Sequence, residues 1–313
     1  MTSTYIDQVM ADFSGYIAMD ELYDGPFCIL SIVDNHTYRQ LMYEVLDHNP
    51  THQDIKHFLL RFRRVLEKHH LELKGVTTDG SPLYPEPLAE VFEGVDHQIC
   101  EFHILKEINK QILKAVTQVR RELKKQLPKL KRGRPCSKAD RRAARRKKKL
   151  QNKITDLFDH RYLFVQYTLT PAEKKTLQRI TRGLPSLRHL RSIVDQVYRL
   201  FDRRCRTETA LAKLAKLRHR VRRFKNLGQV LKKLFTPNIE KALTFLDDSL
   251  LPSTSNAVER GYRRYRKMQK SVYRVRTQEH IIQRIAIDMQ REQQAHGRLQ
   301  TITTLHNERN RAA

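Results

Sequence analysis

The apolar pattern of the chain changes character near Phe102. Before this residue, short apolar runs at positions 15–20, 26–34 and 38–47 are separated by turn residues. Runs of this length with such short connections predict three strands in an antiparallel meander. After Phe102 the strand pattern is lost for about 150 residues, and apolar residues recur at helical spacing. The chain therefore combines a region that contains strands with a long helical region.

Helices and strands are expected to alternate between the meander and Phe102. Thr51 suits the N-cap of a helix in which Ile55, Phe58 and Phe62 recur on one face. A strand is then expected to reach Asp79, followed by a short helix at 88–92 and a strand at 97–102. This order predicts the fold class α/β, with a ribonuclease-H-like mixed sheet and a large all-α insertion domain.

The helical block is expected to interrupt the sheet domain before its last helices. Apolar seams at 187–201 and 214–224 indicate internal packing of a bundle, with a partner-binding coiled coil as the alternative. The predicted division is the first part of the core at 12–104, the helical insertion at 105–251, the last part of the core at 252–296 and a polar tail at 297–313.

The charge balance predicts a polyanionic partner. The chain has 61 Lys and Arg against 34 Asp and Glu, a formal net charge of +27. A protein bound to a membrane surface would share this balance. However, no apolar stretch approaches the roughly 18 residues of a spanning helix, and no signal peptide opens the chain. Four cysteines without disulfide-like spacing indicate a reducing, intracellular compartment.

Residues 129–149 form a segment of extreme basicity. Twelve of them are Lys or Arg, against the single acid Asp140. Such a segment buries no apolar face, so a disordered loop that runs into a solvated helix is expected. Within it, Arg132-Gly-Arg134-Pro has the core sequence of an AT-hook, which would place both arginines in a narrow A·T minor groove. Plain attraction to phosphates and an inert linker are the two alternatives.

Three carboxylates occupy positions that suit a two-metal site for phosphoryl transfer. Asp20 and Asp79 each end an apolar run, and Glu259 opens a very basic helix. Such sites use carboxylates to hold two ions about 3.5–4 Å apart. The strands that carry Asp20 and Asp79 are expected to be neighbours, so both carboxylates would reach one sheet edge. Glu21 alternates to the other face and is predicted to be a poor substitute.

Each of the three carboxylates also has a structural alternative. Asp20 would cap the turn that starts after its strand, and Asp79-Gly80 is an ordinary turn signal. Asn256 and Glu259 have the spacing of a capping box. The convergence of the three carboxylates on two Mg²⁺ or Mn²⁺ ions is therefore a prediction that needs the fold to support it.

The helix that Glu259 opens interleaves arginine with tyrosine. Tyr262 and Tyr265 are expected to stack on frayed bases, while the cations grip phosphates. The residues predicted to bind DNA in this helix are Arg260, Arg263, Arg264, Arg266 and Lys267.

Cys100 and His103 form a Cys-x-x-His motif, which is half of a typical zinc site. No second pair follows at finger spacing. A structural role at a strand-to-helix junction is therefore predicted for both.

Taken together, four stretches resemble DDE transposases of bacterial insertion sequences. The resemblance is to the subset of these transposases that has a Cys-x-x-His motif after the second aspartate, a subset that includes Mutator-like elements. The stretches are Ile17-Ala-Met-Asp20-Glu, Val76-Thr-Thr-Asp79-Gly, Cys100-Glu-Phe-His103 and Thr254-Ser-Asn-Ala-Val-Glu259-Arg. Each motif is weak alone, but their order and the helical insertion make the set fairly specific. The resemblance covers residues 12–295.

The resemblance implies a ribonuclease-H-like core, two divalent ions, strand cleavage by water and strand transfer by the freed 3′-hydroxyl. By position, Asp20 would bridge the two ions, while Asp79 and Glu259 would each complete one. It also implies double-stranded DNA as partner, both transposon ends and target, and a homo-oligomer assembled on that DNA. The expected location is the bacterial cytoplasm, in association with the nucleoid.

One departure from the family concerns the region before Asp20. Only 19 residues precede it, whereas such transposases usually carry a helix-turn-helix region there. We expect that the chain is a fragment, that a separate product recognises the ends, or that the basic insertion does so. Two functional alternatives stay open. One is a ribonuclease-H-like nuclease without strand transfer, and the other is a catalytically idle DNA-binding derivative.

Overall fold

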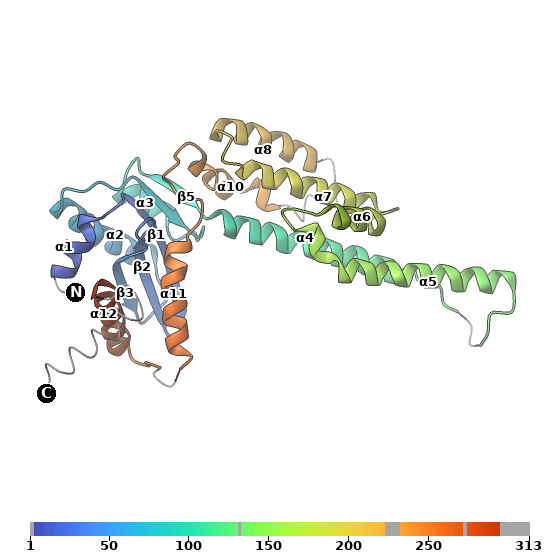
Figure 1. Ribbon diagram of the computed structural model, residues 1–313, viewed down its shortest axis with the longest axis horizontal. Helices are drawn as coiled ribbons and strands as arrows, with labels where there is room; N and C mark the ends of the chain where they lie inside the picture. Colours follow the sequence, from blue (N-terminus) through green and yellow to red (C-terminus); the bar gives the residue numbers. More distant parts are fainter. Residues whose placement is uncertain (1–2, 131–132, 223–231, 272–273, 295–313) are drawn as a thin grey trace. The chain divides into compact units, whose positions relative to one another are not determined.

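A computed structural model describes residues 3–130, 133–222, 232–271 and 274–294 (Figure 1). The chain divides into two compact units. The first combines Met1–Glu101 with Asp247–Ala313, and the second is Phe102–Leu246. The first unit is therefore discontinuous in sequence.

The first unit contains a five-stranded mixed sheet with the spatial order β3-β2-β1-β4-β5 (Figure 1). The strands are β1 (Tyr16–Asp24), β2 (Phe27–Asp34), β3 (Gln40–Leu46), β4 (Gly75–Thr78) and β5 (Asp96–Ile99). Strands β1, β2 and β3 pair in antiparallel fashion, as predicted, whereas β4 runs parallel to both β1 and β5. The predicted fold class, a ribonuclease-H-like α/β sheet with a helical region, is confirmed.

Strand β1 continues past Asp20, where the prediction ended it. Its pairing with β2 runs on to Asp24↔Phe27, because the tight turn between them uses Gly25 with a left-handed φ of 63°. Strand β4, in contrast, pairs with β1 only as far as Ala18↔Thr77. From Met19 onward, the edge of β1 on the β4 side therefore has no strand neighbour.

Helices cover the sheet of the first unit. They are α1 (Ser3–Ala11), α2 (His52–Lys68), α3 (Pro85–Val91), α11 (Asn256–Gln269) and α12 (Gln278–Gln294). Helix α11 lies on β1 and β2, and α12 lies on β3. Strand β2 is buried from Cys28 to Asp34, which is the pattern of a strand covered on both faces. Apolar side chains of α2, α11 and α12 join those of the strands in one core.

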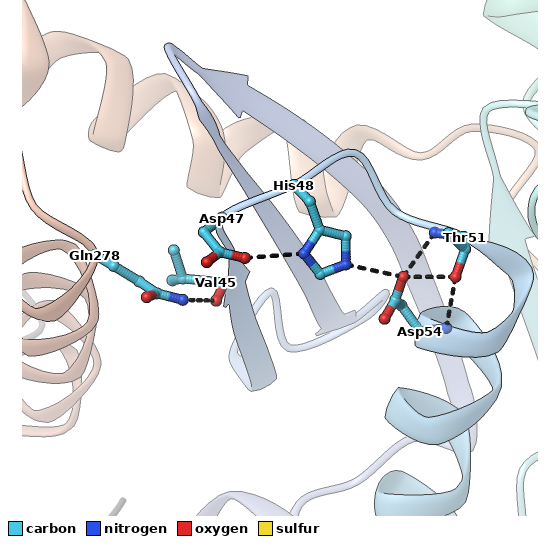
Figure 2. A network of polar contacts seen from close by, with 6 residues as sticks. All are labelled: Val45, Asp47, His48, Thr51, Asp54 and Gln278. Atoms are coloured by element: carbon cyan, nitrogen blue, oxygen red, sulfur yellow. Dashed lines mark hydrogen bonds and ion pairs between the residues drawn. The ribbon is translucent and has the colours of Figure 1, made fainter.

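A polar network surrounds the start of α2 (Figure 2). Thr51 is the N-cap, as predicted, and forms a reciprocal capping box with Asp54. His48 lies between two carboxylates, with Nδ1 2.9 Å from Asp47 Oδ1 and Nε2 3.2 Å from Asp54 Oδ2. Nearby, the side-chain amide of Gln278 donates to the carbonyl of Val45 at 2.7 Å, which ties α12 to β3.

We expect the contacts of His48 to stabilise the fold only at acidic pH. The hydrogen bond with Asp47, followed by that with Asp54, raises the pKa of His48 above 6.5, and the pKa values of both carboxyls are lowered. A raised histidine pKa adds stability below the unfolded-state value, and this is lost as pH rises through the folded-state value. Thermal unfolding should therefore separate wild type from His48→Gln at about pH 5.5 but not at about pH 8.5. A difference that does not change with pH would contradict this assignment.

Helices are the only regular secondary structure among the described residues of the second unit. Its elements include α4 (Glu101–Lys125, which starts at the boundary), α5 (Lys138–Asp159), α6 (Pro171–Ile180), α7 (Pro185–Tyr198), α8 (Thr207–Arg222) and α10 (Asn238–Lys241). Four short 3-10 helices are η1 (Arg161–Phe164), η2 (Arg199–Phe201), η3 (Lys232–Phe235) and η4 (Thr244–Leu246). The apolar seams of α7 and α8 are buried within this unit, as internal packing requires.

Two helix starts in this unit follow from capping chemistry. Thr170 caps α6 through a capping box with Glu173, and Pro171 occupies the first turn, where its missing amide is not needed. Helix α5 starts at Lys138, within the basic segment for which a loop that runs into a solvated helix is expected, because Ser137 and Asp140 form another capping box. Much of the basic segment is therefore an exposed helix.

Candidate metal centre and nucleic-acid interface

Asp20 lies within β1, and Asp79 directly follows β4. Asp20 pairs with Ser31 of β2, so the side chains of Asp20 and Ser31 lie on the same face of the sheet. Asp20 Oδ1 accepts a hydrogen bond from the amide of Glu21 at 2.9 Å. Asp79 Oδ1 accepts one from the amide of Ser81 at 2.7 Å, across Gly80 with a φ of 94°. Since β4 is parallel to β1, both carboxylates reach the same end of the sheet.

The carboxylates of Asp20, Glu21 and Asp79 form a close cluster. One oxygen from each lies within 4.8 Å of the others, and all three residues are half-buried. Within the described ranges, no other group of three His, Cys, Asp or Glu residues has this spacing. Three like charges at this distance repel one another unless protons or cations offset them, so the cluster favours cation binding.

The presence of Glu21 in the cluster differs from the prediction. The register places Glu21 opposite Leu30, on the face away from Asp20, as alternation requires. Its carboxylate nevertheless reaches Asp20 and Asp79 because the edge of β1 is free beyond Ala18. The buried hydroxyl of Tyr84 donates a hydrogen bond to Glu21 Oε2. Burial raises the pKa of Glu21, and the neighbouring charge of Asp79 raises it further.

The segment that leads into α11 is tied to the ends of β4 and β5. The Thr77 hydroxyl donates to the carbonyl of Pro252 at 3.2 Å, and the amide of Ser255 contacts the Cys100 Sγ at 3.5 Å. Cys100 is buried, and its own amide donates to the carbonyl of Thr78 at 2.7 Å. Cys100 therefore lies between the sheet and the start of α11.

His103, the other member of the motif, is half-buried in the first turn of α4, in the second unit.

Helix α11 is fixed to β1 by two buried tyrosines. The Tyr262 hydroxyl donates to the carbonyl oxygens of Asp20 at 2.5 Å and Ile29 at 3.1 Å. The Tyr265 hydroxyl donates to Asp24 Oδ2 at 2.7 Å. Only 4% of Tyr262 and 7% of Tyr265 are exposed, so neither ring is available to stack on bases. That prediction was wrong, because the tyrosine spacing is the apolar stripe by which α11 packs on the sheet.

Glu259 lies one helical turn before Tyr262 and is half-buried. Residues three apart on a helix share a side. The contact of Tyr262 with the Asp20 carbonyl therefore brings the turn that carries Glu259 toward the same part of β1. The 4.8 Å cluster itself does not include Glu259. Ser255, not Asn256, is the N-cap and has no side-chain cap bond, so the capping-box alternative for Glu259 was wrong.

The outward side of α11 is strongly cationic. Its predicted DNA-binding residues, Arg260, Arg263, Arg264, Arg266 and Lys267, are all exposed. The guanidinium of Arg260 lies 4.5 Å from the ring centre of Tyr38, a cation–π contact that fixes its direction. Of the two AT-hook arginines, Arg134 is exposed and Arg132 lies outside the described residues. The cations of α11 therefore have the exposure that phosphate binding requires.

We expect the segment 129–149 to supply DNA affinity and none of the chemistry. Neutralising its twelve cations should flatten the slope of log affinity against log salt by about 0.9 for each phosphate that the segment no longer neutralises. Replacing Arg132 and Arg134 with lysine should weaken binding to A·T duplexes and binding to G·C duplexes equally, as expected if the segment contacts only phosphates. A selective decrease on A·T tracts would instead establish a minor-groove hook, because lysine lacks the flat guanidinium.

Comparison with known proteins identifies the family of the chain. A family model described as transposase, of the DDE type and the ISL3 group, matches residues 29–285. The matched range contains Asp79 and Glu259 and begins after Asp20. Nothing matches among curated proteins or solved structures. Among the described helices, none combines the length and apolar character needed to cross a membrane. The match covers most of the sequence, so the chain belongs to the ISL3-type family of DDE transposases.

Proposed function

We propose that this transposase uses Asp20, Asp79 and Glu259 to hold two divalent cations, and that it cleaves DNA strands and then transfers them. The observation that carries the proposal is the meeting of Asp20 and Asp79. They lie 59 residues apart in the sequence, yet their carboxylates come within 4.8 Å at one end of the sheet. The tie between Tyr262 and the Asp20 carbonyl supports Glu259 as the third member.

The donor atoms suit the proposed ions. Carboxylate oxygens are the hard ligands that Mg²⁺ and Mn²⁺ prefer, and the clustered negative charge needs a cation to offset it. When bound, the ions supply Lewis-acid activation of the phosphate and of the attacking oxygen. Asp20, which lies in a rigid strand, would hold the ions together with Asp79 and Glu259. Glu21 is held by Tyr84 and supports the cluster from the other face.

The proposed reaction has two displacements at phosphorus. In the first, water attacks a phosphodiester at the element end, the bond to the 3′-oxygen breaks, and a free 3′-hydroxyl and a 5′-phosphate result. In the second, that 3′-hydroxyl attacks a phosphodiester of the target, so one phosphodiester forms as another breaks. The exposed cations of α11 and of the segment 129–149 would hold the phosphates of both duplexes.

The proposed partners follow from the same reasoning. They are the ends of the element and the target, both double-stranded DNA, and further copies of this chain assembled on them. The proposed location is the nucleoid of a bacterial cell.

The test is a cleavage and joining assay with linear DNA that carries candidate element ends. We expect strand cleavage with Mg²⁺ or Mn²⁺ but not with EDTA, and joined products when a target duplex is added. Cleavage without joined products would favour the nuclease alternative. Binding with no cleavage under any of these conditions would favour the catalytically idle derivative.

A further inference from the structure

The second unit has a groove along the exposed side of α4. Its volume is 1220 Å³, and its lining runs along α4 from Phe102 to Arg121 and includes Arg161 and Tyr198 from outside that helix. This stretch of helix is about 28 Å long. Pockets for small molecules typically measure about 300–1000 Å³. A groove of this length and volume fits a segment of polymer better than a small ligand.

A row of cations follows the rim of this groove. Lys106, Lys110, Lys114 and Arg121 recur at helical spacing and are exposed. Among the described residues, no Asp or Glu lines the groove. Two acids of α4 lie beside the lining: Glu107 has an oxygen 3.7 Å from Lys110 Nζ, and Glu122 Oε1 accepts a hydrogen bond from Gln118 at 3.2 Å. Both are contacts at the exposed surface and are therefore weak. The charge of the groove is therefore complementary to a polyanion.

Outside α4, the lining adds a fifth, fixed cation. The guanidinium of Arg161 lies 4.4 Å from the ring centres of both Phe158 and Tyr162. It also donates to the carbonyl of Phe158 at 2.7 Å. These contacts hold the guanidinium in place, so it contributes to the groove with little loss of side-chain freedom on binding.

Between the cations, the groove offers apolar surface. Leu105 and Leu113 are half-buried in its lining, and Phe102 is 54% exposed. The outside of a duplex presents phosphates and sugars, which make little use of such a floor. A single strand also exposes the faces of its bases, which stack on aromatic and apolar side chains while cations follow its backbone.

We propose that the α4 groove binds single-stranded DNA, with Lys106, Lys110, Lys114, Arg121 and Arg161 on the backbone and Phe102 against a base. The inference rests on the proposed function in one respect only: strand cleavage and transfer at element ends would produce such a strand. It assigns to the helical unit a binding mode distinct from the phosphate contacts of α11 and of the segment 129–149.

The test compares two variants that lose the same charge. In the first, Lys106, Lys110 and Lys114 are changed to glutamine. In the matched control, the exposed lysines Lys174 and Lys175 of α6 and Lys216 of α8 are changed instead. The probes are fluorescent oligothymidylate and the same strand in a duplex with oligoadenylate. Binding is measured in EDTA over a range of salt, so cleavage does not enter the result, and circular dichroism checks the fold of each variant.

We expect the groove variant to bind the single strand at least tenfold more weakly than the control variant. Its salt slope should fall by about 2, since each phosphate neutralised on a single strand contributes about 0.7. Phe102→Ala should weaken single-strand binding about fivefold or more and duplex binding less than twofold. Equal decreases in both triple variants, or equal decreases on both probes, would overturn the proposal. If wild type never cleaves DNA but these differences appear, the proposed function fails and the groove assignment stands.

Discussion

Replacing Asp20 or Asp79 with asparagine should abolish Mg²⁺-dependent strand cleavage and leave DNA binding intact. Both side chains contribute to the only close carboxylate cluster of the described residues. Metal ions at such sites supply several kcal/mol of transition-state stabilisation, so the cleavage rate should fall about a thousandfold or more. Binding should tighten slightly, because a negative charge that faces phosphate is removed. Rates of cleavage and DNA affinity, measured on the same preparations, check both parts.

Glu21 and Glu259 make this experiment more specific. If Glu259 completes the site, Glu259→Gln should be as inactive as the aspartate variants, while Glu21→Gln should retain measurable cleavage. The matched control is Glu93→Gln, which removes an exposed carboxylate of the first unit outside the cluster. Full activity of Glu259→Gln together with an inactive Glu21→Gln would reassign the third position to Glu21. Full activity of Asp20→Asn would refute the metal site as a whole.

Tyr262→Phe should lower the cleavage rate about tenfold without removing any carboxylate. The change keeps the ring in the core but removes the hydroxyl that donates to the carbonyl oxygens of Asp20 and Ile29. Buried acceptors that lose their donor cost about 1–3 kcal/mol, so the free energy of unfolding should fall by that amount. We expect the slower rate because this hydroxyl fixes the position of α11, and with it Glu259, along β1.

The Mg²⁺ dependence of cleavage distinguishes a positioning role of Tyr262 from a general loss of stability in the variant. If the tyrosine positions Glu259, the variant should need more Mg²⁺ for half-maximal cleavage at a temperature where it is fully folded. Tyr265→Phe offers a matched control on the same helix, since its hydroxyl contacts the side chain of Asp24 and not the Asp20 carbonyl. Equal Mg²⁺ requirements in wild type and both variants would limit Tyr262 to a structural role.

The three-stranded meander and the starts of α2 and α6 follow directly from local chemistry. Thr51 and Thr170 are predictable as caps because a hydroxyl before an apolar helix satisfies free amides at its start. The meander is predictable because short turns join its apolar runs. The end of β1 is not predictable from the sequence. Its last residues are held by pairing with β2, and the apolar pattern of one strand does not reveal how far its partner extends.

Only those site residues that stand out by their own position in the sequence are predictable. Asp20 and Asp79 sit at the ends of apolar runs, which marks them in the sequence. The inclusion of Glu21 depends on where β4 stops pairing with β1, a difference in strand length that alternation alone does not reveal. The roles of Tyr84 and Tyr262 depend on contacts 63 and 242 residues away, and no local pattern distinguishes them from other core tyrosines.

The discontinuity of the first unit has a consequence for its synthesis on the ribosome. Strands β1 and β2 are made early, but the tyrosines of α11 that cover them come only after Phe102–Leu246 has been translated. At about 5–20 residues per second, that interval lasts on the order of 7–30 s. During this time, the apolar face that will receive α11 is exposed and Glu259 does not yet exist. If Glu259 completes the proposed site, a nascent chain cannot cut DNA before the helical unit has been made, and a chain terminated within that unit would be prone to aggregate rather than to act.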